Sequence, residues 1–189
     1  HRTSKTYRIL GKNMIYELLK PTEELLRVEL PNITFEELKE KYDLTPRDLY
    51  DNMIESMQHH GGIGLSANQC GLPIRAFVMI TDMDKREGTI FFNPKITWAS
   101  EETEYFVEGC LTYPHVFLNL KRPKVIRFSY LDIDGIERNA GFSGITAQIF
   151  QHEYDHMEGK NFTMYASRLK LDMALKKAKK KIKKVLKTS

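Results

Sequence analysis

The 189-residue sequence contains little cysteine, one tryptophan and no long apolar run. Its two cysteines, Cys70 and Cys110, are too few for a disulfide framework, so we expect a reducing compartment and a cytoplasmic location. The longest apolar stretches, such as residues 75–80, have the length of a strand, whereas a membrane span needs about 18–20 residues. No signal-peptide pattern opens the chain. Because it begins with His1, import into an organelle followed by trimming stays an alternative.

The chain as a whole has no large excess of one charge, since it contains 29 basic and 25 acidic residues. The C-terminal residues 168–189 contain ten Lys or Arg and one acid, Asp172, so this segment has a net charge of +9. Residues 1–167 keep 19 basic and 24 acidic residues, a net charge of −5. A mildly acidic body excludes a nucleic-acid-binding surface spread over the domain, so we expect no direct DNA binding.

The length and a hydrophobic content of 41% are those of one globular domain. We divide the chain into a main domain, residues 1–167, and a basic amphipathic C-terminal helix, residues 168–189. Apolar side chains recur at helical spacing in this helix: Leu171, Leu175, Ala178, Ile182 and Val185. The helix either docks on the domain by this stripe, or it offers its charge to an anionic partner. RNA or the ribosome is the partner that we favour, and a membrane surface is the alternative.

Helix and strand signals place helices on both sides of a block of strands. Thr45 can cap a helix that Pro46 opens and that ends near His60. Strand-like runs follow at residues 75–80, 88–97, 103–107 and 124–132. A turn is predicted at residues 132–135. A last core helix is predicted over residues 143–158. This order predicts an α+β fold with a mixed or antiparallel sheet.

Two histidines four residues apart, His152 and His156, lie in the last predicted core helix, with Glu153 between them. Residues at this spacing share a helix face, so both imidazoles can bind one metal ion while Glu153 acts as a general base. The alternative is a pair of core histidines satisfied by hydrogen bonds. A metzincin protease would have a third His at position 162, which is Phe162 here, and no gluzincin-type Glu follows. The common zinc-protease patterns are therefore incomplete.

A cysteine upstream offers a different third ligand. Cys110, in the segment Glu-Gly-Cys-Leu-Thr at residues 108–112, follows a strand-like run and a glycine. A Cys-His-His set binds zinc or ferrous iron and leaves a fourth position for water, as catalytic sites do. A lone cysteine is otherwise more often a small buried hydrophobe. The glycine-containing residues 62–69 can bring backbone close to a substrate, and Gln69 can supply an amide donor.

Together, the three segments resemble the motifs of peptide deformylases, metal enzymes that remove the formyl group from the N-terminal methionine of new bacterial and organellar proteins. The family motifs are Gly-x-Gly-Leu-Ala-Ala-x-Gln, Glu-Gly-Cys-Leu-Ser and Gln-His-Glu-x-Asp-His. Here they correspond, in the same order, to residues 62–69, 108–112 and 151–156. The resemblance covers most of the chain. Three residues inside the motifs differ from the family pattern: Ser66, Asn68 and Thr112. Each has about the size and polarity of the residue that it replaces.

The resemblance implies one divalent metal ion held by three side chains, those of Cys110, His152 and His156. It implies Fe²⁺ in the cell, while Zn²⁺, Ni²⁺ or Co²⁺ can occupy the same ligands in a purified sample. Glu153 would take a proton from the water that the metal activates, and this water would attack the formyl carbon. The metal, the backbone N–H of Leu111 and the side-chain amide of Gln69 would stabilise the oxyanion. Glu153 would then return its proton to the departing amine, releasing formate.

A pocket for the methionine side chain and the peptide backbone is implied as well. Helical spacing puts three candidates on the face of His152, namely Ile145, Gln148 and Ile149. The resemblance adds Gly64 for backbone hydrogen bonds, Ile63 and Phe106 for the apolar wall, and Arg122 at a common basic position. Core packing is the alternative for the Ile and Phe positions. Gln148, a polar residue where an apolar one is expected, either lines the pocket or points to solvent. Phe117 stands where bacterial relatives often carry an Arg that helps hold the substrate.

Two other classes of function stay open at this point. One is a zinc protease, which the missing third ligand disfavours. The other is a non-catalytic, metal-stabilised module that binds the ribosome through the basic helix, but Glu153 and Gln69 argue against it because a structural site needs no base. We expect formyl-methionyl nascent peptides as substrates, a ribosome contact through residues 168–189 as a candidate interaction, and a monomer. Glu108 and Asp155 are candidates for the carboxylate that orients a ligand histidine.

Overall fold

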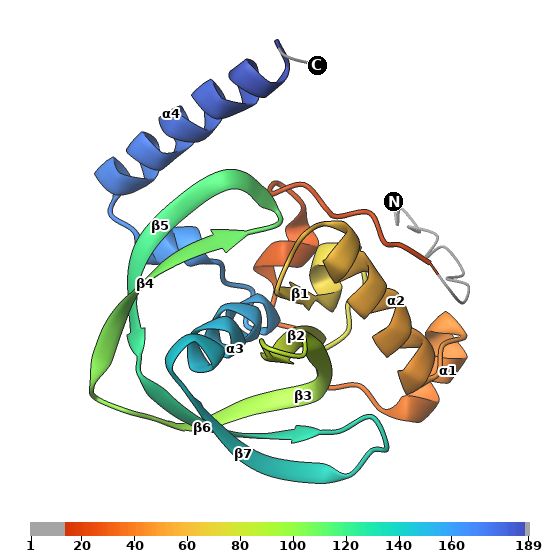
Figure 1. The fold of residues 1–189 in the computed structure, drawn as a ribbon. Helices are drawn as coiled ribbons and strands as arrows, with labels where there is room; N and C mark the ends of the chain where they lie inside the picture. Colours follow the sequence, from red (N-terminus) through yellow and green to blue (C-terminus); the bar gives the residue numbers. More distant parts are fainter. Residues whose placement is uncertain (1–13, 188–189) are drawn as a thin grey trace.

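The computed structural model describes residues 14–187 (Figure 1). The first 13 residues of the predicted main domain and the last two of the predicted basic helix lie outside the described residues. Within that range the chain folds into two antiparallel sheets and four α-helices, which is the α+β class that the sequence predicts. Short 3-10 helices are also present, at Glu24–Arg27, Ala67–Cys70 and Phe162–Tyr165.

The larger sheet has five antiparallel strands in the order β1-β2-β3-β6-β7. Their bounds are Gly64–Ser66 for β1, Ala76–Asp82 for β2, Glu87–Ala99 for β3, Val125–Leu131 for β6 and Glu137–Ser143 for β7. The smaller sheet is a hairpin of β4, Thr103–Cys110, and β5, Tyr113–Pro123. The predicted turn at residues 132–135 connects β6 to β7, where the N–H of Gly135 donates to the carbonyl of Asp132.

The helices are α1 at Phe35–Tyr42, α2 at Pro46–His59, α3 at Gly144–Met157 and α4 at Arg168–Val185. The cap predicted for α2 is confirmed. The Thr45 side chain accepts from the backbone N–H of Asp48, and the Asp48 carboxylate accepts from the backbone N–H of Thr45. The predicted core helix is confirmed as α3, and Gly159 follows it with a φ of +67°, a conformation that favours glycine.

Helix α3 lies in the middle of the fold, in contact with strands of both sheets (Figure 1). Its Phe150 packs on Phe128 with ring centroids 4.0 Å apart and on Phe77 at 5.0 Å, which fixes the helix against the larger sheet. A separate apolar cluster holds α1 and α2 on β2 and β3. Because aromatic packing buries α3 on most sides, the polar residues of this helix are carried into the interior.

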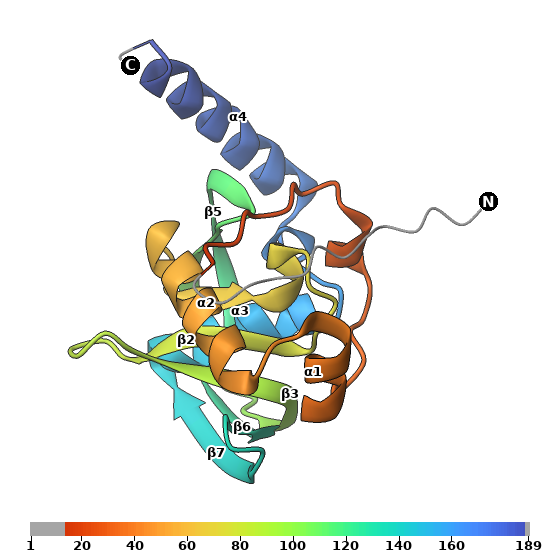
Figure 2. The same ribbon diagram turned by 90° about the vertical axis from the view of Figure 1, so that its right-hand side faces the viewer.

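Helix α4 extends away from the body of the molecule (Figure 2). Only the first part of its apolar stripe is docked: Ala178 is buried, and Leu171, Ala174 and Leu175 pack beside β5. The far part is exposed at Ile182 and Val185. The docking alternative therefore accounts for three of the five stripe residues. Among the described helices, none combines the length and apolarity that crossing a membrane requires.

The sequence did not predict β5, which begins next to Pro114 and ends at Pro123. Proline cannot donate to a ladder, so it lowers the strand signal. Proline is tolerated in β5 because this strand pairs only with β4, and because Pro114 and Pro123 lie near the ends of the strand. This strand matters for the site, since it carries residues that face α3.

Candidate metal centre and substrate pocket

One turn of α3 places two imidazoles on the same side of the helix. His152 and His156 are both buried, and their ring centroids lie 5.3 Å apart. The backbone carbonyl of His156 accepts a hydrogen bond of 2.9 Å from Nδ2 of Asn68, which connects the end of α3 to the 3-10 helix after β1. The helix therefore presents its two histidines at a fixed position toward β4.

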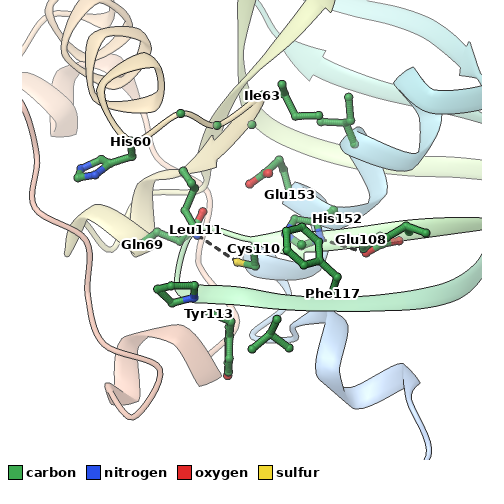
Figure 3. Close-up of a pocket in the computed structure, with 18 of the residues that line it drawn as sticks. His60, Ile63, Gln69, Glu108, Cys110, Leu111, Tyr113, Phe117, His152 and Glu153 are labelled. Atoms are coloured by element: carbon green, nitrogen blue, oxygen red, sulfur yellow. Dashed lines mark hydrogen bonds and ion pairs between the residues drawn. The ribbon is translucent and has the colours of Figure 1, made fainter. Parts of the chain in front are cut away.

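Cys110, the last residue of β4, brings its sulfur to these histidines, and Figure 3 shows it beside His152. Its Sγ lies 3.5 Å from Nε2 of His156, and one ligand atom from each of Cys110, His152 and His156 lies within 4.8 Å of the others. A tetrahedral ion with bond lengths of about 2.3 Å to sulfur and 2.0 Å to nitrogen separates such atoms by about 3.5 Å. The three predicted ligands thus fit a tetrahedral ion with a fourth position left open.

The thiol of Cys110 and the imidazole of His152 shift each other's pKa in opposite directions. Burial raises the pKa of the Cys110 thiol, but the neighbouring His156 and His152 outweigh it and hold this pKa well below its usual range. Burial lowers the pKa of His152, while Cys110 and Glu108 together raise it well above its ordinary value. The lowered pKa of Cys110 favours the thiolate, which is the form of cysteine that binds metals.

A buried ion-pair network orients His152. Its Nδ1 lies 3.1 Å from Oε2 of Glu108, so its other nitrogen, Nε2, faces the centre (Figure 3). Arg122 binds Glu108 in a bidentate manner at 2.7 and 2.9 Å and donates to Asp155 at 2.7 Å. Burial raises the pKa of Glu108, but Arg122 and His152 lower it to about 2, so this carboxylate is charged. Glu108 is thus the carboxylate that orients a histidine.

The network corrects the prediction that Arg122 binds substrate. Its side chain is 4% exposed and lies among Glu108, Asp155 and the ring of Tyr165, whose centroid is 4.5 Å from the guanidinium carbon. It is not among the residues that line the pocket. Arg122 lies near the end of β5, and the alternation of that strand turns its side chain inward, toward α3.

Gln69 is held beside the sulfur by its neighbours. Its Oε1 accepts from the backbone N–H and the hydroxyl of Ser66, both at 2.9 Å. Its Nε2 donates to Oγ1 of Thr112 at 2.9 Å and to Sγ of Cys110 at 3.4 Å. Leu111 and Thr112 form the two-residue connection between β4 and β5, which places Leu111 next to the same sulfur. The amide donor and the Leu111 backbone therefore lie at one edge of the centre.

Glu153 lies on the other side of the centre, toward β1 (Figure 3). Burial raises the pKa of Glu153 to about 7, even though His152 and His156 act to lower it. Its Oε2 is buried and has no hydrogen-bond partner within the described residues. A buried carboxyl group with a pKa near neutrality suits a residue that accepts and returns a proton.

The centre opens into a cavity of about 750 Å³. Five of the seven predicted substrate-binding residues line it, namely Ile63, Gly64, Ile145, Gln148 and Ile149, together with the predicted oxyanion residues Gln69 and Leu111. Gln148 lies in the pocket wall and not in solvent, with 5% of its surface exposed. Phe106 does not line the cavity, which corrects its assignment to the apolar wall. Because side chains alternate along a strand, its neighbour Val107 lines the cavity in its place.

Several residues of the site were missed by the sequence analysis. Ser66 and Thr112 fix the Gln69 amide, and Tyr165 donates to Asp155 at 2.9 Å. Ser66 and Thr112 were noted only as departures from the motifs, and nothing local marked Tyr165. Phe117, 58% exposed, was noted only for what it replaces, but it lines the cavity mouth.

Known proteins are similar to this chain over most of its length. A family model described as polypeptide deformylase matches residues 16–172. The peptide deformylase of Bartonella tribocorum is 36% identical over 163 residues, which cover 82% of this chain and 92% of that protein. The peptide deformylase of Phenylobacterium zucineum is 40% identical over 143 residues, covering 75% and 85%.

A solved structure agrees with these relatives. The peptide deformylase of Legionella pneumophila has a TM-score of 0.78 and 31% identity, covering 93% of this chain and 99% of that one. The resemblance carried by the three sequence motifs is confirmed. The chain belongs to the polypeptide deformylase family, enzymes that remove the N-formyl group from newly made polypeptides.

Proposed function

We propose that Cys110, His152 and His156 hold one divalent metal ion, and that Glu153 carries the proton in hydrolysis of the formyl amide. The observation that carries this proposal is the convergence of the Cys110 sulfur and both imidazoles within 4.8 Å, beside a cavity that Cys110, His152 and Glu153 line. The substrate is the formyl-methionyl end of a nascent peptide.

The donor set supports a catalytic metal and not a structural one. When bound, a divalent ion with three protein ligands supplies a polarised water near neutral pH and a positive charge beside the scissile carbonyl. One thiolate and two imidazoles accept Fe²⁺, Zn²⁺, Ni²⁺ or Co²⁺. We propose Fe²⁺ in the cell and one of the other ions in protein purified in air.

Glu153 moves the proton. Its carboxylate accepts a proton from the attacking water as oxygen bonds to the formyl carbon. It then gives that proton to the amine nitrogen as the carbon–nitrogen bond breaks, which yields formate and a free N-terminus. The pKa of about 7 for this buried group supports both steps at neutral pH.

Two donors stabilise the negative charge that develops on the formyl oxygen. The Nε2 of Gln69 is already aimed at the centre, 3.4 Å from Sγ of Cys110, and Ser66 holds its other end. The backbone N–H of Leu111 is the second donor. Because Ser66 holds the Gln69 amide beside the centre before substrate arrives, less reorganisation is needed during the reaction.

Formate release from a short formyl-Met peptide tests this proposal. Protein loaded anaerobically with Fe²⁺ or with Ni²⁺ is expected to release formate, and Glu153→Ala is expected to lose most of this activity while it still binds one metal per chain. Protein that holds one metal and releases no formate would contradict the proposal. The alternative of a non-catalytic, metal-stabilised module would then be favoured.

We also propose that α4 contacts the ribosome. The basic side chains of its far half, including Lys179, Lys180, Lys181 and Lys183, are exposed on a helix that extends from the body. Replacing these four lysines with Gln keeps the docked part with Ala178 and is expected to weaken ribosome co-sedimentation, with turnover of a free peptide unchanged. Equal co-sedimentation of both proteins would contradict this contact.

We further propose that residues 1–167 form the catalytic unit and that the enzyme acts as a monomer in the cytoplasm. Every group of the site comes from one chain, so a second copy is not needed to complete it. A free Cys110 also requires a reducing compartment. Sedimentation of the full chain at several concentrations tests the monomer.

A further inference from the structure

Gln148 stands out in the wall of the substrate cavity. It precedes His152 by one turn of α3, about 6 Å along the helix axis, so it lies on the face that carries the metal ligand. Its side chain is almost fully buried, and its Oε1 has no hydrogen-bond partner within residues 14–187. A buried amide oxygen without a partner is rare in folded proteins, because burial removes the water that would bind it.

The surroundings of Gln148 do not supply the missing partner. The residues beside it on α3 and across the cavity are apolar: Ile145, Ile149 and Ile63. Two polar groups of the site are engaged elsewhere, and a third, the carboxylate of Glu153, whose Oε2 also lacks a partner, only accepts when it is ionised. Gln69 binds Ser66 and Thr112, and Glu108 binds Arg122 and His152. A molecule that enters the cavity can therefore supply a partner for Oε1 of Gln148.

We propose that Gln148 makes this pocket select a first side chain of methionine length that ends in a hydrogen-bonding group, in preference to a hydrocarbon of the same length. This inference rests on the proposed function, because it concerns the residue that follows the formyl group. A terminal amide has one acceptor and two N–H donors, and a rotation of 180° exchanges its ends.

The consequences differ between side chains. A glutamine side chain entering the pocket can pair its amide with that of Gln148, donating to Oε1 and accepting from Nε2. A thioether sulfur accepts only weakly, and a norleucine side chain offers no partner at all. An occupant without a partner leaves the Gln148 amide desolvated, and this penalty is what discriminates against the hydrocarbon.

Three peptides that differ only in the first side chain test the proposal: formyl-Met-Ala-Ser, formyl-Gln-Ala-Ser and formyl-norleucine-Ala-Ser. The quantity to compare is the ratio of kcat/KM for the glutamine peptide to that for the norleucine peptide. Gln148→Met keeps the length of the side chain and removes the amide. We expect it to lower this ratio about tenfold, the usual effect of one neutral hydrogen bond.

Ile145→Met is the matched control, because it changes the same wall from one apolar residue to another. It is expected to leave the glutamine-to-norleucine ratio close to that of the wild type. A second measurement avoids turnover altogether. In the Glu153→Ala background, with and without Gln148→Met, calorimetry gives the dissociation constants of the two peptides, and their ratio is expected to shift in the same direction.

Equal ratios in the wild type and Gln148→Met would overturn the inference, even if formyl-Met-Ala-Ser is hydrolysed well. A ratio lowered as much by Ile145→Met as by Gln148→Met would also overturn it, since shape and not the amide would then discriminate. If none of the three peptides is hydrolysed, the proposed function fails, and the binding ratio in the Glu153→Ala background still decides the role of Gln148.

Discussion

The carboxyl group of Glu153 lies directly against the Cα of Gly64, so that a β-carbon at position 64 would collide with Oε1 of Glu153. The glycine is therefore required by the space that the carboxyl group occupies and not by an unusual backbone conformation. Strand β1 and helix α3, far apart in sequence, meet at this point. The contact fixes the position of Glu153 in the cavity.

We expect Gly64→Ala to lower kcat for a formyl-Met peptide by about 10²-fold or more. The added methyl group displaces Glu153, and a positioned general base contributes about 10²–10⁴-fold to such a reaction. Metal content should stay at one ion per chain, because Gly64 does not touch the ligands. Gly141→Ala, a glycine in β7 outside the cavity, is the control and should keep its activity. Full activity of Gly64→Ala would show that Glu153 tolerates the shift.

Arg122→Met is expected to destabilise the fold by about 3–5 kcal/mol, because it leaves the buried carboxylates of Glu108 and Asp155 without their partner. Urea unfolding measures this change. Arg47→Met breaks an exposed ion pair with Asp51 and should cost about 0–1 kcal/mol. If the two variants lose the same stability, the buried network does not hold the fold together.

Removal of the metal with a chelator is expected to abolish formate release and to expose one additional reactive thiol, that of Cys110, which lines the cavity. Burial raises the pKa of Cys70, so this second thiol should stay slow in both states. Labelling with a thiol reagent measures the number of reactive thiols with and without metal. Cys110→Ser is the control, because its number of reactive thiols should not change when the metal is removed. The same thiol count with and without metal would argue against Cys110 as a ligand.

Tyr16 is expected to make the fold sensitive to alkaline pH. Burial raises the pKa of Tyr16 from about 10 to about 12, against the opposing effect of a hydrogen bond from Asn52. Because the folded state holds the phenol proton more tightly, this stabilisation is complete below pH 10 and is lost between about pH 10 and pH 12. Tyr16→Phe should therefore show a shallower fall in the free energy of unfolding over that range.

Tyr105→Phe is the control for this pH dependence, since Tyr105 is largely exposed. Its unfolding free energy should follow that of the wild type from pH 9 to pH 12. Parallel curves for Tyr16→Phe and the wild type would mean that the buried phenol contributes nothing to the alkaline transition.

Local signals in the sequence were sufficient for several features. Thr45, Pro46 and Asp48 define the start of α2, because a cap is made by residues within one turn of each other. The spacing of His152 and His156 defines a shared helix face for the same reason. The residues made Cys110 only a candidate ligand, and the resemblance of its motif assigned it, since nothing local shows that β4 ends beside α3.

The sequence by itself determined the fold class, the histidine pair with Glu153, and the division between a mildly acidic body and a basic helix, because these depend on neighbours along the chain. Only the tertiary structure decided that Arg122 binds Glu108 and Asp155, that Val107 and not Phe106 faces the cavity, and that the Gln148 amide is buried without a partner. Each of these depends on how β4, β5 and α3 pack, and burial and pairing between distant segments follow from packing and not from local sequence.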